Sequence, residues 1–232
     1  MDGILLVDKP SEWTSMDVCA HLRGVLHERH IGHTGTLDPN ATGLLVVLTG
    51  KGTKAAKYAE NDTKEYMARL RLGMRTDTQD IWGTVLERNG QTRTREEIEA
   101  VLSDFRGDIL QLPPMYSAIK IRGKKLYEIA RRGGDVEREP RPITIFRLEL
   151  QEPDEKGDWG LRIECSKGTY IRTLCADIGE ALGCGGCMSA LRRVRCGKYT
   201  LEEAHTLEEI RENPEGYILP LERITGKESS HG

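Results

Sequence analysis

The spacing of apolar residues along the chain predicts more strands than helices. Short apolar runs such as GILLVD and LLVVL have the length of buried strands. In KEYMARLRLG, every second side chain from Tyr66 to Leu72 is apolar, which is typical of an antiparallel strand with one buried face. Strands are therefore expected at residues 3–10, 44–50, 64–73, 141–153 and 159–168.

Apolar residues at helical intervals predict helices between these strands. The helices are expected at residues 15–27, 94–105 and 169–182. Ser15 is the expected N-cap of the first helix, and Thr94 and Glu97 have the spacing of a capping box at the start of the second. Gly183 is expected to end the third helix. Because the helices do not alternate regularly with the strands, an α+β fold is favoured over a doubly wound one.

The length and composition of the sequence indicate a globular protein of the cytoplasm. The 232 residues suffice for one large domain or two small ones, and 38% of them are hydrophobic. The sequence has no apolar run of about 18 residues and no leader-like N-terminal segment, so we expect neither a membrane span nor export.

The cysteines predict free thiols. Six cysteines in a chain without an export signal favour thiols over a disulfide framework. Cys184 and Cys187 have CxxC spacing, which suits zinc or redox chemistry. A zinc site needs two further ligands, and no second CxxC or HxxxH motif supplies them. Zinc binding and a redox pair stay open as alternatives, but buried thiols without chemistry are favoured and no metal site is expected.

Charge is unevenly distributed along the chain. The formal net charge is −3, but residues 118–147 hold nine basic and four acidic side chains, and residues 199–232 hold three basic and eight acidic ones. A polyanion responds to such a local basic patch rather than to the total charge. Within residues 111–134 a double-proline turn, a short strand and a basic amphipathic helix are expected. Residues 120–140 are thus a candidate basic insertion, with a solvated charged face as the alternative.

The segment GHTGTLDPNATGLL, residues 32–45, carries the most distinctive candidate for chemistry. It has neither the GxGxxG spacing nor the GK[ST] ending of a phosphate-binding loop. Pro39 restricts the backbone of Asp38 to extended conformations, which would hold the carboxylate in one direction. An Asp-Pro turn without chemistry is the alternative that this segment alone leaves open.

Six segments in a common order resemble the TruB family of tRNA pseudouridine synthases, and they extend from about residue 3 to residue 199. The segments are GILLVDKPSEWTS, GHTGTLDPNATGLL, KEYMARLRLGMRTDTQDIWG, QLPPMYSAIKIRGKKLYEIARRGG, CSKGTYIRTLCADIGEALG and LRRVRCGKY. The resemblance implies the pseudouridine synthase fold, in which a mixed, mostly antiparallel sheet is flanked by helices and loops and carries a basic thumb insertion.

The resemblance also implies a reaction, the isomerisation of uridine to pseudouridine at position 55 in the T-loop of tRNA. The target base is flipped out, its N1 glycosidic bond breaks, and C5 bonds to the same sugar carbon. The implied partner is the T-arm of tRNA. No cofactor, metal, membrane or obligate protein partner is implied, and the enzyme is expected to be a monomer.

Three residues match catalytic positions of the family. Asp38 matches the catalytic aspartate, and whether it acts as a nucleophile or as a base stays open. Arg172 matches the arginine that pairs with this aspartate and keeps it ionised. Tyr66 matches the tyrosine that stacks on the target base, and its hydroxyl is a candidate proton carrier. A plain core position in its strand is the alternative for Tyr66.

Further residues match substrate-binding positions of the family. Tyr170 and Leu191 match residues that line the uracil pocket, and His33 matches a histidine that supports the flipped-out substrate. Ordinary packing is the alternative for all three. Contacts to the RNA backbone are expected from six basic residues of the insertion: Lys120, Arg122, Lys124, Lys125, Arg131 and Arg132.

The resemblance sets the expected domain limits. Residues 1–221 are expected to form the catalytic domain, with a thumb-like insertion at about residues 120–140. Residues 222–232 are expected to form a short tail in place of the C-terminal PUA domain that is usual in the family.

Two other functions compete with the synthase. An inactive relative that acts as a tRNA chaperone is disfavoured by the three intact catalytic positions. A glycosidase that releases the free base would normally present two carboxylates, and Asp177 is the only partner for Asp38 that the matching segments offer.

Overall fold

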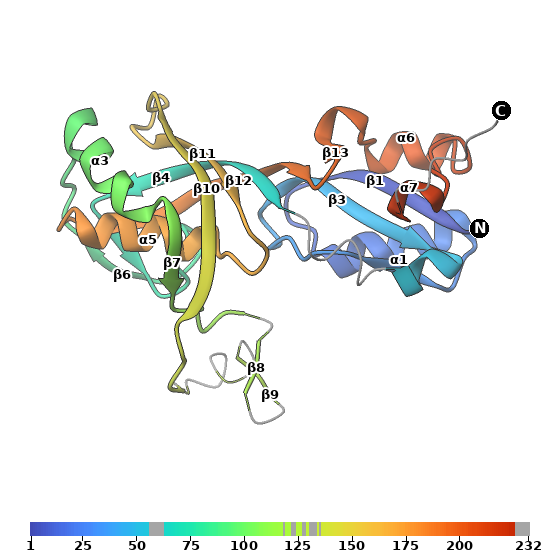
Figure 1. The fold of residues 1–232 in the computed structure, drawn as a ribbon, viewed down its shortest axis with the longest axis horizontal. Coiled ribbons are helices and arrows are strands. Elements are labelled where there is room, and N and C mark those ends of the chain that lie inside the picture. Colours follow the sequence, from blue (N-terminus) through green and yellow to red (C-terminus); the bar gives the residue numbers. More distant parts are fainter. Residues whose placement is uncertain are drawn as a thin grey trace. The chain divides into compact units, whose positions relative to one another are not determined.

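The structure is a computed structural model of the chain. It describes residues 1–55, 63–117, 119–121, 124–126, 129, 134 and 136–225. The chain forms two compact units (Figure 1). The first unit comprises residues 1–67 and 191–232, so it contains the blue start and the red end of the chain, and the second comprises residues 68–190.

Each unit contains its own strands and helices. The elements of the first unit are β1 (Gly3–Lys9), α1 (Ser15–Leu26), β2 (Ile31–His33), β3 (Thr42–Thr49), a 3-10 helix (Gly50–Ala55), β13 (Tyr199–Thr200), a second 3-10 helix (Leu201–Glu203), α6 (Leu207–Glu212) and α7 (Glu222–Thr225). The elements of the second unit are β5 (Met74–Thr76), β6 (Val85–Arg88), α3 (Arg95–Leu102), a 3-10 helix (Ser103–Phe105), β7 (Gly107–Gln111), β8 (Lys120–Ile121), β9 (Lys124–Lys125), β10 (Arg141–Gln151), β11 (Trp159–Cys165) and α5 (Ile171–Ala181). Strands β4 (Lys64–Leu72) and β12 (Gly186–Cys196) each run from one unit into the other.

The sheet of the first unit is built on β3. Strand β1 runs antiparallel to β3 along its whole length, β2 also pairs antiparallel with β3, and β12 pairs parallel with it. Odd-numbered side chains such as Leu5 and Val47 pack against α1. Even-numbered ones such as Leu6 and Leu48 pack against the C-terminal segment, including Leu219. Because both faces are covered, these strands are continuous apolar runs rather than alternating ones.

The N-cap of helix α1 lies one residue earlier than expected. Its N-cap is Thr14, whose hydroxyl accepts a hydrogen bond from the Asp17 N–H at 3.0 Å while the Asp17 carboxylate accepts from the Thr14 N–H at 2.9 Å. The prediction that Ser15 caps the helix is therefore wrong. Thr14 completes a capping box that Ser15 could not form with Asp17, since the box requires a spacing of three residues. Ser15 is the first helical residue and is buried.

In the second unit, the strand order is β12–β4–β11–β10–β7. Strand β10 runs antiparallel to both β11 and β7. The capping box of α3 is confirmed, because the Thr94 hydroxyl accepts from the Glu97 N–H at 3.3 Å and the Glu97 carboxylate accepts from the Thr94 N–H at 2.7 Å. Gly183 follows the end of α5 with a φ of 69°, a conformation that favours glycine.

The expected α+β fold with a mixed, mostly antiparallel sheet is confirmed, and β3 with β12 forms a parallel pair. The basic amphipathic helix expected within residues 111–134 falls largely on residues outside those described. All six cysteines are buried and none is in a disulfide. Among the described residues, no helix is both long and apolar enough to cross a membrane.

Candidate active site

Asp38 lies in the segment that joins β2 to β3, where its side chain is partly exposed. The Ala41 N–H donates a hydrogen bond to the Asp38 carbonyl at 3.1 Å and closes a four-residue turn. Pro39 is the second residue of this turn, a position that its fixed φ suits. The expected Asp-Pro turn is thus present, and it restricts the directions in which the Asp38 carboxylate can point.

Ser15 binds the backbone immediately before this turn. Its hydroxyl accepts from the Leu37 N–H at 2.9 Å and donates to the Leu37 carbonyl at 3.1 Å. Since Ser15 is the first residue of α1, the helix and the segment that carries Asp38 are joined by two hydrogen bonds through one buried hydroxyl.

Lys9 binds the backbone within the turn. Its side chain is fully buried, and its ammonium donates to the carbonyls of Pro10 at 2.8 Å, Trp13 at 2.6 Å and Pro39 at 2.9 Å. An ammonium has three donors, so these three carbonyls satisfy it. The last residue of β1 is therefore tied to the residue that follows Asp38.

The charge of Lys9 depends on its buried surroundings. The pKa of Lys9 is lowered to about 8, mainly by burial and also by the positive charge of Arg193, while the negative charges of Asp38 and Asp17 act in the opposite direction. At neutral pH Lys9 is therefore still mostly an ammonium, with Asp38 close enough to stabilise its charge.

Arg193 binds both flanks of the Asp38 segment. Only 1% of Arg193 is exposed, and its guanidinium donates from Nε to the Leu44 carbonyl at 2.7 Å and from Nη2 to the Gly35 carbonyl at 3.1 Å. Arg193 pairs with Gly43 in the parallel ladder of β12 and β3. Gly43 has a φ of 97°, and a Cβ atom there would lie 2.3 Å from the Arg193 carbonyl oxygen. Glycine at this position therefore permits the close approach of β12 to β3.

Three other expected site residues lie in the same unit. His33 is the last residue of β2, Tyr66 is buried in β4, and Leu191 is buried in β12. Burial of Tyr66 and Leu191 fits a uracil pocket and ordinary packing equally, so their roles stay predictions.

Arg172 lies at the start of α5 in the second unit and is 5% exposed. Its guanidinium donates to the carbonyls of Thr78 at 3.1 Å and Tyr116 at 2.9 Å, and Nη1 lies 3.9 Å from the Asp80 carboxylate. These contacts fix the position of a buried cation on a helix, where an arginine would more often be exposed. The pairing of Arg172 with Asp38 stays a prediction.

Tyr170 immediately precedes α5. Its N–H donates to the Gln111 side chain at 2.8 Å, and the Gln111 amide donates back to the Tyr170 carbonyl at 3.0 Å. This reciprocal pair orients the backbone of Tyr170 against the end of β7.

The six basic residues expected to bind the RNA backbone are only partly described. Lys120 and Lys125 face each other in the short ladder of β8 and β9, and Lys124 belongs to the same ladder. The side chains of these three lysines, and all of Arg122, Arg131 and Arg132, lie outside the described part of the chain.

Sequence reasoning missed the residues that hold the Asp38 segment, namely Lys9, Ser15 and Arg193. All three act through backbone carbonyls or N–H groups, so their partners leave no pattern of side chains in the sequence. The signal that was available is a charged residue that ends an apolar strand, as in GILLVDK for Lys9. A charge in such a place must find buried partners.

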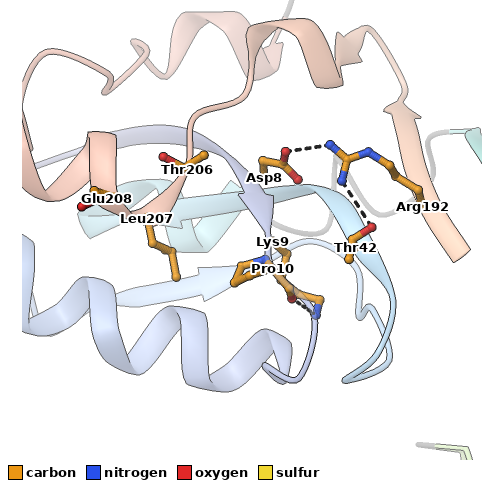
Figure 2. Close-up of a pocket in the computed structure, with 8 residues that line it drawn as sticks. All are labelled: Asp8, Lys9, Pro10, Thr42, Arg192, Thr206, Leu207 and Glu208. Atoms are coloured by element: carbon orange, nitrogen blue, oxygen red, sulfur yellow. Dashed lines mark hydrogen bonds and ion pairs between the residues drawn. The ribbon is translucent and has the colours of Figure 1, made fainter. Parts of the chain in front are cut away.

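The first unit also contains a pocket of about 350 Å³ (Figure 2). Its wall is formed by Asp8, Lys9, Pro10, Thr42, Arg192, Thr206, Leu207 and Glu208. Arg192 donates to the Asp8 carboxylate at 2.7 Å and to the Thr42 hydroxyl at 3.2 Å, as Figure 2 shows. The wall includes none of the residues expected to contact uridine.

Comparison with solved structures defines the class of protein. The chain is similar to the crystal structure of a Cbf5–Nop10–Gar1 complex, with a TM-score of 0.76 and 30% sequence identity over 96% of this chain and 61% of that one. It is also similar to an H/ACA ribonucleoprotein bound to a substrate RNA containing 2′-deoxyuridine, with a TM-score of 0.72 and 27% identity over 96% of this chain and 60% of that one. The fold is that of the pseudouridine synthases.

Comparison with protein families defines the family. Residues 23–171 match the TruB family pseudouridylate synthase N-terminal domain, and residues 172–224 match the tRNA pseudouridylate synthase B C-terminal domain. The chain therefore belongs to the TruB family of pseudouridylate synthases, as the six segments predict. The predicted enzyme class, an isomerase that converts uridine to pseudouridine in tRNA, is confirmed by this membership.

Curated relatives agree with the family. A tRNA pseudouridine synthase B of Syntrophomonas wolfei is 48% identical over 229 residues, which are 96% of this chain and 77% of the relative. The protein of the same name from Escherichia coli K12 is 47% identical over 212 residues, which are 91% of this chain and 67% of the relative.

Proposed function

We propose that the protein isomerises the uridine at position 55, in the T-loop of tRNA, to pseudouridine. The proposal is carried by one observation, an aspartate held in a proline turn by buried side chains in a chain of the TruB family. It is supported by relatives that bear the name tRNA pseudouridine synthase B and by a similar ribonucleoprotein that holds substrate RNA with a 2′-deoxyuridine.

The proposed reaction rearranges bonds within one nucleotide. The bond from N1 to C1′ breaks and a bond from C5 to C1′ forms, while C5 loses its proton and N1 gains one. Because atoms and electrons balance within the substrate, the reaction requires no cofactor. A stacked base cannot be reached from the sugar and from both faces, so the base must leave its stack at a cost of a few kcal/mol.

Asp38 is proposed as the group that acts at the sugar. Cleavage of a glycosidic bond develops positive charge at C1′, and a carboxylate can stabilise this charge, attack the carbon, or remove the 2′ proton. Both the nucleophile and the base mechanism remain in the proposal. The turn through Pro39 restricts the carboxylate, and preorganisation of this kind lowers the barrier. Arg172 is proposed to pair with Asp38 and to keep it ionised.

The remaining site residues are proposed to hold the base. Tyr66 stacks on the flipped uracil and carries a proton through its hydroxyl. Tyr170 and Leu191 line the pocket, and His33 supports the flipped-out arrangement.

The RNA is proposed to be the T-arm of tRNA, with phosphate contacts from the basic insertion. The domain limits stay as predicted, with a catalytic domain at residues 1–221 and a tail at residues 222–232. The enzyme is proposed to act in the cytoplasm as a monomer without an obligate protein partner. Light scattering on the purified protein tests the monomer.

The direct test is to map pseudouridine in tRNA treated with the purified protein. Pseudouridine at position 55 is the expected result. Release of free uracil would favour the glycosidase, and tight tRNA binding without any product would favour the chaperone. Modification at another position alone would overturn the proposed site.

Asp38→Asn is expected to abolish turnover and to leave tRNA affinity within about threefold of the wild type, because the amide keeps the shape of the carboxylate and the phosphate contacts remain. Asp104→Asn is the matched control, since Asp104 is an exposed carboxylate in the second unit. Single-turnover kinetics and filter binding on the same tRNA measure the two effects. Wild-type rates from Asp38→Asn would remove Asp38 from its catalytic role.

A further inference from the structure

We propose that Arg193 is a positioning residue of the isomerisation, which fixes the backbone on both sides of Asp38. The proposal depends on the catalytic role assigned to Asp38 under the proposed function. Arg193 itself need not contact the substrate, because it acts through the loop that carries Asp38.

The contacts of Arg193 enclose the loop. Gly35 lies three residues before Asp38 and Leu44 lies six residues after it. One guanidinium binds both carbonyls, at 3.1 Å from Nη2 to Gly35 and at 2.7 Å from Nε to Leu44. Both ends of the loop are therefore held by a single rigid group.

The position of this guanidinium is fixed by its own strand. Arg193 pairs with Gly43 in the parallel ladder of β12 and β3, and the absence of a side chain at Gly43 lets the two backbones approach closely. Lys9 binds the Pro39 carbonyl at 2.9 Å from β1. The turn is thus held by two buried cations on two different strands.

The energetics of burial argue that Arg193 serves more than stability. A buried cation loses its hydration, and a well-packed apolar residue at such a place is often as stable or more stable. Here the two buried cations also repel each other, and this repulsion contributes to the lowered pKa of Lys9. The free-energy cost of burying Arg193 is explained if the loop needs two hydrogen bonds in fixed directions. If the loop moved away from this geometry, the buried guanidinium of Arg193 would lose its hydrogen-bond acceptors, which costs free energy.

The neighbouring residue offers a matched comparison. Arg192 pairs with Thr42 in the same ladder, but its side chain is 42% exposed and binds Asp8 and the Thr42 hydroxyl rather than the loop backbone (Figure 2). An arginine-to-lysine change at residue 192 therefore alters the same strand and the same residue type without altering the support of Asp38.

The test compares Arg193→Lys and Arg193→Met with Arg192→Lys, using a T-arm RNA that contains the target uridine. Lysine donates from a single point and cannot place donors at the two separate positions that Nε and Nη2 of Arg193 occupy, and methionine can bind neither carbonyl. For both Arg193 variants we expect kcat to fall about tenfold or more with KM within about twofold, because ground-state binding does not depend on the exact direction of Asp38. For Arg192→Lys both constants are expected to stay at the wild-type values.

All rates are measured at a temperature at which circular dichroism shows that each variant is folded. Two Arg193 variants are used so that the test still stands if one of them fails to fold. Hydrogen–deuterium exchange of the peptide covering residues 32–45 is expected to accelerate in both Arg193 variants and not in Arg192→Lys. A purely structural role predicts a lower melting temperature with an unchanged kcat in the folded protein, and this result would overturn the proposal. If Asp38→Asn keeps its activity, the assignment of Asp38 fails. If Asp38→Asn is inactive while the Arg193 variants keep their kcat, only the positioning role fails.

Discussion

At the scale of single residues, buried cations distinguish the segment that carries Asp38 from an ordinary turn. Lys9 and Arg193 are among the largest fully buried side chains of the protein. Both direct their donors to main-chain carbonyls. A buried charge is tolerated only when it is satisfied in this way, so the geometry of the turn and the state of the cations are linked.

The pKa of Lys9 predicts a pH dependence of stability. The group has a pKa of about 8 in the folded protein against an ordinary value of 10.5. Between these two values the unfolded chain binds more protons, so the free energy of unfolding rises with pH, with a slope of up to about 1.4 kcal/mol per pH unit. Below pH 8 both states are protonated and the contribution of Lys9 becomes constant.

Lys9→Met is expected to lack this rise. Urea unfolding of wild type and variant at several pH values from about 7 to 10 measures the difference between their slopes. Lys51→Met is the control, since the Lys51 side chain is 82% exposed and the variant is expected to follow the wild type. Parallel curves for wild type and Lys9→Met would contradict the prediction.

The sequence predicted Asp38 but not the residues that support it. Pro39 fixes the backbone of its neighbour by local sterics, and such local effects can be deduced from adjacent residues. The carbonyl of Pro39 that Lys9 binds, and both carbonyls that Arg193 binds, lie far away in the sequence, and every residue has a carbonyl. Only the fold could show which of these carbonyls they bind.

At the scale of elements, prediction succeeded where one physical signal was strong. The apolar runs of β1 and β3 and the capping box of α3 were correct because packing and capping both leave local patterns. Strand β12, with the sequence GCMSALRRVRC, has no regular alternation of apolar and polar residues. Its two central arginines interrupt the apolar pattern, and they are accommodated by hydrogen bonds to Asp8 and to the Leu44 carbonyl. Strand β6 is exposed at every residue, so it has no apolar alternation to detect.

Helix α5 carries a carboxylate whose charge opposes stability. Burial, together with the nearby negative charge of Glu180, raises the pKa of Asp177 to about 6. The ordinary value is 3.8, so between these values the folded protein binds more protons. The free energy of unfolding therefore falls as the pH rises from about 4 to 6, and the full penalty is present above pH 6.

Asp177→Asn is expected to raise the free energy of unfolding at pH 7 by about 1 to 2 kcal/mol, because the amide is not charged when buried. The gain in stability is expected to disappear below about pH 4, where Asp177 of the wild type is protonated and therefore as neutral as the asparagine of the variant. Denaturant unfolding at both pH values measures it, with Asp104→Asn as the exposed control. Turnover is expected to stay at the wild-type rate. Loss of turnover in Asp177→Asn, together with release of free uracil by the wild type, would instead support a glycosidase with a second carboxylate.

At the scale of the whole molecule, the distribution of charge matters more than its total. The net charge of −3 would oppose RNA binding, while nine basic residues within residues 118–147 favour it. Association with RNA releases counterions from the phosphates that the protein binds, so the salt dependence of the affinity reports how many phosphates are bound.

Lys124→Ala combined with Lys125→Ala is expected to weaken tRNA binding and to lower the slope of log K against log salt by about one for each phosphate that the variant no longer binds. Filter binding at several salt concentrations measures the slope. Lys51→Ala combined with Lys54→Ala removes the same charge at two exposed positions of the first unit and is expected to leave the slope unchanged. An unchanged slope in the first double variant would mean that the basic insertion does not contact RNA.

The family could be recognised from the sequence, but the division into two units could not. A boundary is usually marked by a linker rich in proline, glycine or polar residues. Here the boundaries lie at residues 67–68 and 190–191, inside β4 and β12. The pattern of a strand continues through each boundary, so composition does not change there.

The hydroxyl of Ser15 has a consequence for heat inactivation. Two hydrogen bonds attach Leu37, the residue before Asp38, to the first residue of α1. An active-site loop without such an attachment commonly loses order at temperatures where the scaffold is still intact. Because of this attachment, we expect the loop and the first turn of the helix to lose their order together, and catalysis to persist up to the temperature at which α1 itself melts.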